Sequence, residues 1–488
     1  MAASRVMGTG ELQRSSDEAA NPRRAKVPTV HGPWKGKQRR YAKSEQTMAT
    51  DLTRIGEKAR REPGLVFTSL YHHICDVDNL RACYDALDAN KATGADGMAK
   101  AQYGEKLEEN LRELSERLKR MGYRPGPKRR SYIPKPGNAK GRPLGISNFE
   151  DKIVEAATKR TLEPIYEAVF ADSSYGYRPG RSPHACLDKL GRTIQQRKVN
   201  HVVEADIRSF FDKVNHDWMI KFLRHRIGDE RVIRLIIRML KSGILEDGLT
   251  RATEEGTPQG SILSPLLSNI YLHYVLDLWF RERVRRKSRG EAYYFRFADD
   301  FLACFQYRED AMRFRQELEE RLKKFSLKLA EDKTQCIKFG RFAREDARKR
   351  GGKPEEFTFL GFTHYCGKTR NGDFKVKRRT SRKKMGQSLG KFHEWARKAR
   401  AVLSKGEMIR AANVRVRGHL KYYAITDNAE QCNNYVYRAT HTLYKWLNRK
   451  SQRRAYNWEQ FRQVLNLQNW PTVRIHKDLN PYRRAEAC

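Results

Sequence analysis

The chain has 488 residues, of which 39% are hydrophobic and 10% aromatic, enough for about two to four domains with a large core. Its 99 Lys and Arg residues outnumber 58 Asp and Glu residues, giving a formal net charge of +41. This excess favours a polyanionic partner, nucleic acid before membrane, because the sequence has no apolar run long enough to span a bilayer.

The N-terminal segment, residues 1–60, is polar, basic and poor in periodic apolar positions, which is typical of a flexible basic arm. Its first residues lack the apolar core of a secretory signal. The eight cysteines are scattered with no C-x-x-C pair, which argues against a disulfide framework or a zinc module. These features favour a reducing cytosol.

Helix and strand patterns mix between about residues 61 and 365. Apolar residues at helical spacing predict a helix from Leu107 to Met121, ended by Gly122, and another from Ala311 to Phe325. Short apolar runs predict strands at 201–211, 292–297, 301–305 and 357–365. This order favours an α+β fold, and the lack of a G-x-G-x-x-G or Walker-type loop excludes dinucleotide oxidoreductases and P-loop NTPases.

A change of composition follows residue 370. A dense basic run at 375–384 precedes predicted helices at 389–403, 414–425 and 435–454, in which aromatic side chains interleave with Lys and Arg. A charge run alone is usually a solvated face. Cations beside aromatic rings on so basic a chain instead favour a nucleic-acid groove.

The stretch 293–305 places two adjacent carboxylates, Asp299 and Asp300, between two apolar runs. A solvated turn is the plain interpretation, because Asp is a common turn residue. We predict a hairpin with Ala298, Asp299 and Asp300 at or near its turn. Asp206 also ends an apolar run, and carboxylates gathered from two strands would suit two Mg²⁺ ions, the arrangement used for in-line attack on a phosphate.

Eight segments carry a family resemblance that covers about residues 66–460. They are, in chain order, KATGADGM (91–98), IPKPGNAKGRPLGI (133–146), SYGYRPGRSPHACL (174–187), ADIRSFFD (205–212), GTPQGSILSPLLSNIYL (256–272), RFADDF (296–301), AEDKT (330–334) and FTFLGF (357–362). With RGHLKYYAI at 417–425, they resemble bacterial group II intron-encoded reverse transcriptases and maturases.

The resemblance implies an α+β right-hand polymerase. Fingers and palm, with an antiparallel palm sheet, would occupy 61–365, and a helical thumb or maturase (X) domain 366–455. A short basic tail at 456–488 would be a remnant of a DNA-binding segment. Many relatives carry a cysteine-rich endonuclease module there, whereas this tail has one cysteine, so we expect no endonuclease.

The implied activity is RNA-directed DNA synthesis by a two-metal mechanism, joined to binding of the structured intron RNA and help in its splicing and mobility. Expected partners are an RNA template, a DNA primer or target, and dNTPs, with Mg²⁺ as cofactor, Mn²⁺ as its substitute, and no membrane. The expected location is the bacterial cytoplasm, with the nucleoid or RNA. Two alternatives stay open: a host-adopted relative acting in DNA repair or phage defence, and an RNA-binding splicing factor without polymerase activity.

The resemblance also assigns residues. Asp206 and Asp299 would be the principal metal ligands, supported by Asp300 and the backbone carbonyl of Ile207. The residues matched to dNTP binding are Lys135 and Arg142 at the triphosphate, Phe211 as the steric gate against a 2′-hydroxyl, Gln259, and Lys333 near the leaving phosphate. Those expected to contact template-primer or RNA are Gly260, Phe297, Lys377, Arg378, Arg379, Arg417 and Tyr422. Phe297 stands where the family usually has Tyr.

Overall fold

The structure is a computed structural model that describes residues 51–135, 138–450 and 455–482, without the side chains of 135 and 138–140. The expected N-terminal arm lies largely outside the described residues. Residues 51–61 nevertheless form a helix, and Leu52 and Ala59 are buried in it. This helix, which packs on the body of the protein, overlaps the last ten residues of the expected arm.

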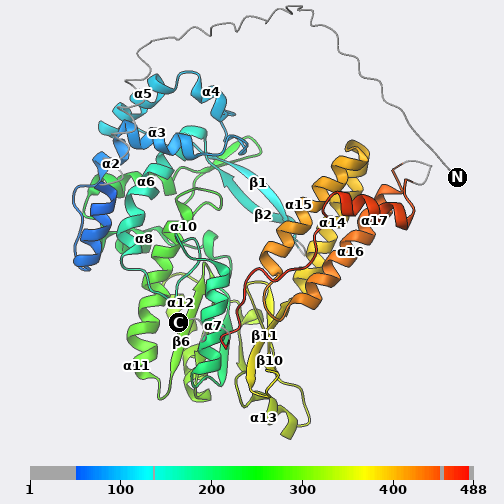
Figure 1. Ribbon diagram of the computed structural model, residues 1–488. Helices are drawn as coiled ribbons and strands as arrows, with labels where there is room; N and C mark the ends of the chain where they lie inside the picture. Colours follow the sequence, from blue (N-terminus) through cyan, green and yellow to red (C-terminus); the bar gives the residue numbers. More distant parts are fainter. Residues whose placement is uncertain (1–50, 136–137, 451–454, 483–488) are drawn as a thin grey trace, which may run out of the picture.

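A group of helices forms the N-terminal part of the body (Figure 1). They are α2 (Tyr71–Cys75), α3 (Val77–Ala86), α4 (Lys100–Gly104), α5 (Leu107–Lys119) and α6 (Phe149–Glu167). The leucine spacing predicted α5 correctly, since Leu111, Leu114 and Leu118 are completely buried. The helix ends two residues earlier than expected, and Met121 rather than Gly122 takes the left-handed conformation after it (φ 58°).

The first sheet has the strand order β2-β1-β4-β5. The strands β1 (Lys128–Lys135) and β2 (Asn138–Ile146) form an antiparallel hairpin, and β4 (Ile244–Glu246) pairs with β1 in parallel and with β5 (Leu249–Arg251) antiparallel. Two helices, α8 (His216–Arg224) and α9 (Glu230–Leu240), precede β4. This sheet borders the hollow described below.

The second sheet is antiparallel, with the order β6-β7-β3-β8. Its strands are β3 (His201–Ala205), β6 (Ala292–Phe297), β7 (Asp300–Phe305) and β8 (Gln335–Lys338). Alternate residues point to opposite faces: Val203 packs in the core that includes α12 (Arg308–Lys324), whereas Val202 packs in the core that includes α7 (Pro183–Gln196). Helices therefore cover both faces, which explains why β6 and β7 are almost wholly apolar.

One long helical stretch connects the first two sheets. It runs through α10 (Ser264–Leu272), the π-helical turns η2 (His273–Asp277) and η3 (Phe280–Val284), and α11 (Arg285–Lys287). Asn269 and Asp277 on this stretch are buried, although their side chains are polar. Both side chains accept hydrogen bonds from Arg296 of β6.

The third sheet has the order β11-β10-β9, with β9 (Phe357–Phe359), β10 (Phe362–Lys368) and β11 (Phe374–Thr380) following α13 (Ala343–Lys349). Six of the ten residues of the basic run 375–384 thus lie in a strand, which the sequence did not predict. The expected domain boundary at residue 366 lies inside β10, which pairs with β11 along its whole length.

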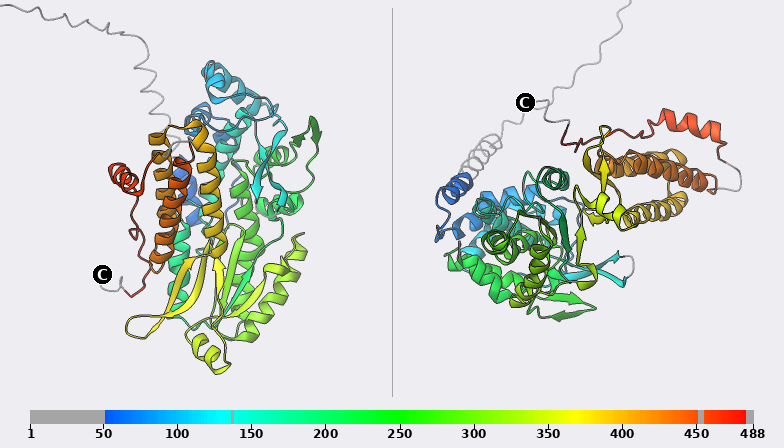
Figure 2. Two further views of the ribbon diagram at one scale, coloured as in Figure 1. Left: turned by 90° about the vertical axis from the view of Figure 1, so that its right-hand side faces the viewer. Right: turned by 90° about the horizontal axis from the view of Figure 1, so that it is seen from below.

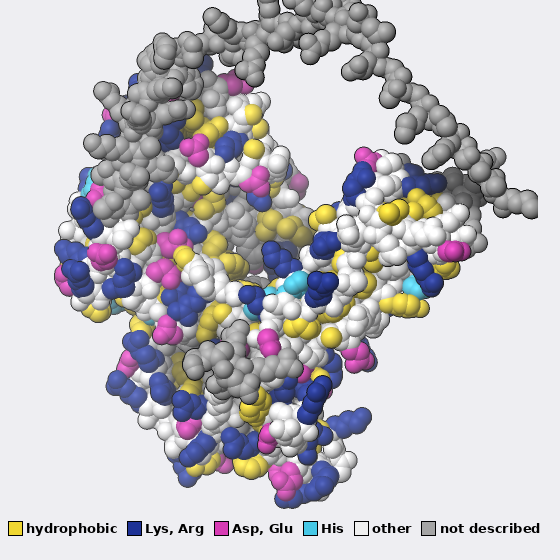
Figure 3. All heavy atoms as spheres, viewed as in Figure 1, with side chains coloured by type: hydrophobic (Ala, Val, Ile, Leu, Met, Phe, Trp, Pro, Cys, Tyr) yellow, Lys and Arg dark blue, Asp and Glu magenta, His cyan; other side chains and the backbone are white. Residues whose placement is uncertain are grey.

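Four helices follow the third sheet: α14 (Arg382–Val402), α15 (Lys405–Tyr423), α16 (Ala429–Leu447) and α17 (Trp458–Leu467). They share a separate hydrophobic core and stand beside the rest of the molecule (Figures 1 and 2). Figure 3 shows a wide hollow between them and the N-terminal helices, with Lys and Arg side chains at its base. No described helix is both long and apolar enough to cross a membrane.

Candidate active site

The strands β6 and β7 form the predicted hairpin. Phe297 pairs with Asp300, so Ala298 and Asp299 make the two-residue loop between them. Ala298 is buried and has a left-handed backbone (φ 59°), a conformation that is unfavourable for a residue with a Cβ atom. The hairpin prediction is confirmed, and the surrounding structure must hold this turn in its shape.

Asp206 reaches the same end of the sheet from the neighbouring strand. Ala205, the last residue of β3, pairs with Phe301 of β7, which places Asp206 beside the hairpin loop. The backbone carbonyl of Asp206 accepts a hydrogen bond from Ala330 N (2.9 Å), and the buried Ile207 forms an antiparallel bridge with Leu329. The structure therefore brings Asp206, Asp299 and Asp300 together.

These three carboxylates affect one another electrostatically. Burial, followed by the charge of Asp206, raises the pKa of Asp299. Asp300 reaches solvent, but the protein around it limits its hydration; this and the charges of Asp299 and Asp206 raise its pKa to about 6. Mutual repulsion of this kind is relieved when a cation lies between the acids.

The donor set suits Mg²⁺, which prefers oxygen ligands and commonly takes one or two carboxylates, with waters and substrate phosphates completing its shell. Within the described ranges, no three His, Cys, Asp or Glu residues are spaced to hold a metal ion by themselves. The arrangement therefore fits an ion that shares its ligands with a nucleotide rather than a closed protein cage. Within the described residues, one cation is bonded directly to the three carboxylates. It is the ammonium of Lys333, which forms an ion pair with Asp206.

The turn of the hairpin is held from behind by Arg296, which the sequence-based analysis missed. Its guanidinium is completely buried and contacts Asp277 through two hydrogen bonds, Nε–Oδ1 at 2.8 Å and Nη2–Oδ2 at 2.6 Å. Its Nη1 donates to Asn269 Oδ1 (2.9 Å) and to the Ala298 carbonyl (3.0 Å). An arginine inside an apolar strand, with an acid inside the apolar stretch 270–280, was the signal that could have revealed this pair.

The residues matched to nucleotide binding lie around the carboxylates. Arg142, on β2, is exposed, and its charge acts to lower the pKa of Asp299, so the two side chains face a common space. The side chain of Lys135 lies outside the described residues. Lys333 lies in the short helix η4 (Glu331–Lys333), where its pKa is raised by the bond to Asp206.

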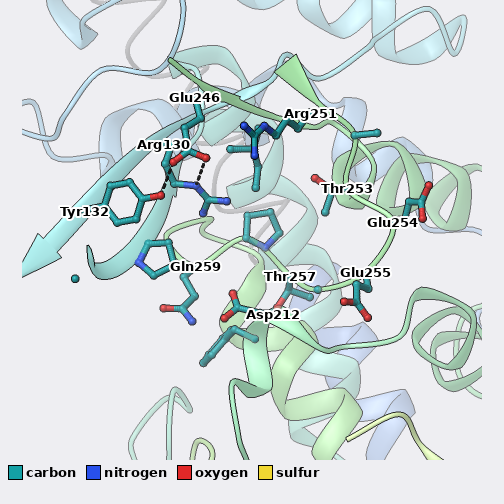
Figure 4. Close-up of a pocket in the computed structure, with 17 residues that line it drawn as sticks. Arg130, Tyr132, Asp212, Glu246, Arg251, Thr253, Glu254, Glu255, Thr257 and Gln259 are labelled. Atoms are coloured by element: carbon teal, nitrogen blue, oxygen red, sulfur yellow. Dashed lines mark hydrogen bonds and ion pairs between the residues drawn. The ribbon is translucent and has the colours of Figure 1, made fainter. Parts of the chain in front are cut away.

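Phe211 and Gln259 line a cavity of about 600 Å³, whose wall also includes Asp212 and Glu246 (Figure 4). Phe211 is half-buried against the fully packed Phe210, with ring centroids 5.3 Å apart. Tyr132 and Arg130 meet Glu246 at the cavity wall. Phe211 is thus only partly a core residue, because one side of it faces open space.

The loop that carries Gln259 and Gly260 crosses β2 closely. The backbone carbonyl of Gln259 accepts a hydrogen bond from Gly145 N (2.7 Å). Gly260 has φ 115°, and a Cβ atom there would lie 2.8 Å from the Gly145 carbonyl oxygen. Only glycine fits at this position without moving the backbone.

The basic residues of β11 that we expected to contact nucleic acid differ in how far their side chains are exposed. Lys377 is half-exposed on β11, and Arg379 pairs with Glu356 (2.6 Å) while lying over the Tyr365 ring. Arg378 departs from the expectation. It is 2% exposed, and its Nη2 donates to the Leu187 carbonyl, so it anchors β11 on α7 instead of facing a ligand.

The remaining three expected contacts are tied into the fold. Tyr422 donates its hydroxyl to the Leu360 carbonyl (2.8 Å), and the exposed Arg417 bonds Asn413 and the Asn469 carbonyl. Phe297 is half-buried against the core beneath the hairpin. Each of these side chains has a structural role whether or not it also contacts RNA.

Comparison with known proteins agrees with this geometry. Residues 133–364, which span all three carboxylates, match the family described as reverse transcriptase (RNA-dependent DNA polymerase). This domain implies a right-hand polymerase fold, consistent with the mixed helices and antiparallel sheets. The protein is thus an RNA-directed DNA polymerase.

Three related proteins show which kind of reverse transcriptase this chain resembles. The chain is 30% identical over 469 residues to the group II intron-encoded protein LtrA of Lactococcus lactis subsp. cremoris, covering 82% of this chain and 77% of that protein. It is 40% identical over 205 residues to protein YkfC of Escherichia coli (strain K12), 41% of this chain and 53% of that protein. It is 33% identical over 95 residues to a mitochondrial nuclear intron maturase of Arabidopsis thaliana, 19% and 13% of the two chains. The chain belongs to the group II intron-encoded reverse transcriptases and maturases.

Proposed function

We propose that the chain extends a DNA primer on an RNA template at Asp206, Asp299 and Asp300, and that it also binds its intron RNA and assists splicing and mobility. The main support for primer extension is that three carboxylates, from the end of β3 and from the β6–β7 hairpin, lie together. The raised pKa values of Asp299 and Asp300 indicate a site that is incomplete without a cation. The names of the intron-encoded relatives support the second half.

Two Mg²⁺ ions held by Asp206 and Asp299, with Asp300 and the Ile207 carbonyl in support, would activate the primer 3′-hydroxyl and neutralise charge on the leaving pyrophosphate. The protein's own groups do the positioning. Arg142 binds phosphate oxygens with its planar fork, and Lys333 moves from Asp206 to the leaving phosphate. Phe211 abuts the sugar and rejects a 2′-hydroxyl, while Arg296 fixes the loop that carries Asp299.

The domain assignment follows from the same proposal. The sheet β6-β7-β3-β8 is the palm, the β1–β2 hairpin and the N-terminal helices are the fingers, and α14–α16 are the thumb or maturase domain. The basic strand β11 and these helices would bind intron RNA, which proteins recognise largely through shape and phosphate contacts. The template-primer would then occupy the hollow between fingers and thumb.

The test compares Asp206→Asn and Asp299→Asn with Asp85→Asn, which changes an exposed carboxylate on α3. We expect the first two to lose primer extension by at least about a hundredfold, a barrier increase of about 2.7 kcal/mol, with intron RNA affinity unchanged. The control should extend normally. Near-normal extension by Asp206→Asn and Asp299→Asn with Mg²⁺ would refute the proposed site. Loss of RNA affinity in these variants would refute the separation of the two functions.

A further inference from the structure

The loop 173–178 is fastened to the carboxylate-bearing hairpin. Tyr175 N donates to the Arg296 carbonyl (2.8 Å), and Arg296 N donates to the Ser173 carbonyl (2.9 Å). Gly176 lies so close to the hairpin that a Cβ atom there would be 2.2 Å from Ala298 N. Since side-chain atoms do not approach a backbone that closely, only glycine lets this loop reach the turn.

The same loop is held on its other side. Asn269 Nδ2 donates to the Gly176 carbonyl (2.7 Å). Arg178 is buried and binds both carboxylate oxygens of Glu167 (3.0 Å), together with the carbonyls of Ala171 and Ser174. The residues on either side of position 177 therefore have fixed positions, and Asn269 joins this loop to the Arg296 network behind the hairpin.

Tyr177, between these two anchors, is exposed by 50% and has a left-handed backbone with φ 58°. This conformation is rare for a bulky residue and costs stability, whereas glycine would adopt it freely. Residues held in such conformations by the surrounding structure cluster at functional sites. A strained aromatic side chain that remains half exposed therefore needs another reason for its position.

Because Gly176 packs directly on the hairpin loop, Tyr177 lies near enough to the carboxylates for their charges to act on its phenol. Burial and then the charges of Asp299 and Asp300 raise its pKa, while Arg142 acts in the opposite direction. All three groups belong to the proposed nucleotide site, and the phenol stays protonated beside them. Within the described residues, the Tyr177 hydroxyl has no hydrogen-bond partner, so its O–H is free to donate to a ligand.

We propose that Tyr177 is a substrate-contacting residue that donates its hydroxyl to a phosphate oxygen of the incoming nucleoside triphosphate, between Arg142 and the carboxylates. This inference rests on the proposed function. Gly176 and Arg178 fix the loop against the hairpin, and the strained backbone of Tyr177 is held in place between them. Tyr177 thus helps to bind the nucleotide and takes no part in bond formation itself.

The test uses single-nucleotide incorporation by the full chain on one primer-template, which separates KM for dNTP from kcat. Tyr177→Phe should raise KM about two- to tenfold, the loss of one neutral hydrogen bond, with kcat and the Kd for primer-template unchanged. Tyr307→Phe removes an exposed hydroxyl just beyond the opposite end of β7 from the carboxylates, and it should change none of these values. An unchanged KM in Tyr177→Phe would overturn the inference.

A second variant separates binding from folding. Tyr177→Gly should raise KM at least as much as Tyr177→Phe, while its midpoint of thermal unfolding stays at or above that of the parent, because glycine relieves the backbone strain. A lower midpoint would mean that Tyr177 stabilises the fold, which contradicts the inference. The proposed function fails separately, if Asp299→Asn keeps normal extension. Normal extension by the parent with an unaltered KM in both Tyr177 variants would refute this inference alone.

Discussion

Arg296 and Asp277 form a completely buried ion pair with two hydrogen bonds, directly behind the loop that carries Asp299. Burial alone would raise the pKa of Asp277, but the adjacent guanidinium holds it below its usual value. The same guanidinium donates to the Ala298 carbonyl, so the left-handed turn of the hairpin is fixed by a charge that water does not reach. A metal ligand needs this kind of rigid support.

We therefore expect Arg296→Met to lower the free energy of unfolding by about 3–5 kcal/mol, because it leaves Asp277 buried without its partner. The double variant Arg296→Met/Asp277→Leu should recover much of that stability. It should not recover primer extension, since the Ala298 carbonyl still lacks its donor. Urea unfolding and primer extension measure the two effects, and full extension by a stable double variant would contradict this role for Arg296.

The sequence predicted the parts of the site that follow local rules. The apolar runs around Asp299 and Asp300 predicted the hairpin, and strand position predicted Asp206 beside it. Arg296 and Asp277 escaped notice, and Arg378 was expected to contact RNA, because a charged residue suggests a surface until its distant partner is known. Arg378, for example, bonds a carbonyl 191 residues away in the chain. Long-range pairs of this kind require the folded structure.

Phe211→Ala should admit ribonucleotides, because the ring that would meet the 2′-hydroxyl is removed. The half-buried position of Phe211 beside the cavity makes this change tolerable for folding, whereas the buried Phe210 has no such freedom. Incorporation of a single dNTP or rNTP measures the ratio of their kcat/KM values. A ratio equal to that of the parent would mean that Phe211 packs in the core and does not discriminate between the two sugars.

Replacing Lys377 and Arg379 with Ala should weaken RNA binding and flatten its dependence on log salt, by up to about one unit per lost phosphate contact. Arg378→Met provides the contrast. Burial lowers the pKa of Arg378 to about 10, partly offset by Asp427, and its loss should reduce stability without changing the salt slope. Binding isotherms at several salt concentrations distinguish the two. An unchanged salt slope in Lys377→Ala/Arg379→Ala would mean that these residues are solvated and make no phosphate contacts.

Asp300→Asn should raise the unfolding midpoint of the metal-free protein at about pH 7.5. Burial and the neighbouring acids raise the pKa of Asp300 from 3.8 to about 6, so the cost of ionising it in the folded state grows between these two pH values and is fully present above about pH 6. As the pH falls from about 7 toward 4, the parent carboxyl becomes protonated and the advantage of Asn should disappear. Mg²⁺ should raise the midpoint of the parent more than that of Asp300→Asn, since ions that bind the folded state stabilise it. An equal response to Mg²⁺ would argue against Asp300 as a supporting ligand.

Phe297→Tyr restores the residue that the family usually has before Ala-Asp-Asp, and we expect the variant to remain active. Phe297 is the last residue of β6 and pairs with Asp300, and its ring is half-buried against the core below, so either side chain can fill the position. The added hydroxyl can gain or lose one hydrogen bond, worth about 0.5–1.5 kcal/mol, which limits the change in kcat/KM for dNTP to about tenfold. Both proteins should be measured on one RNA template. A much larger change in either direction would mean that Phe297 is a specialised feature of this polymerase, and that the site described by Asp206, Asp299 and Asp300 lacks a component.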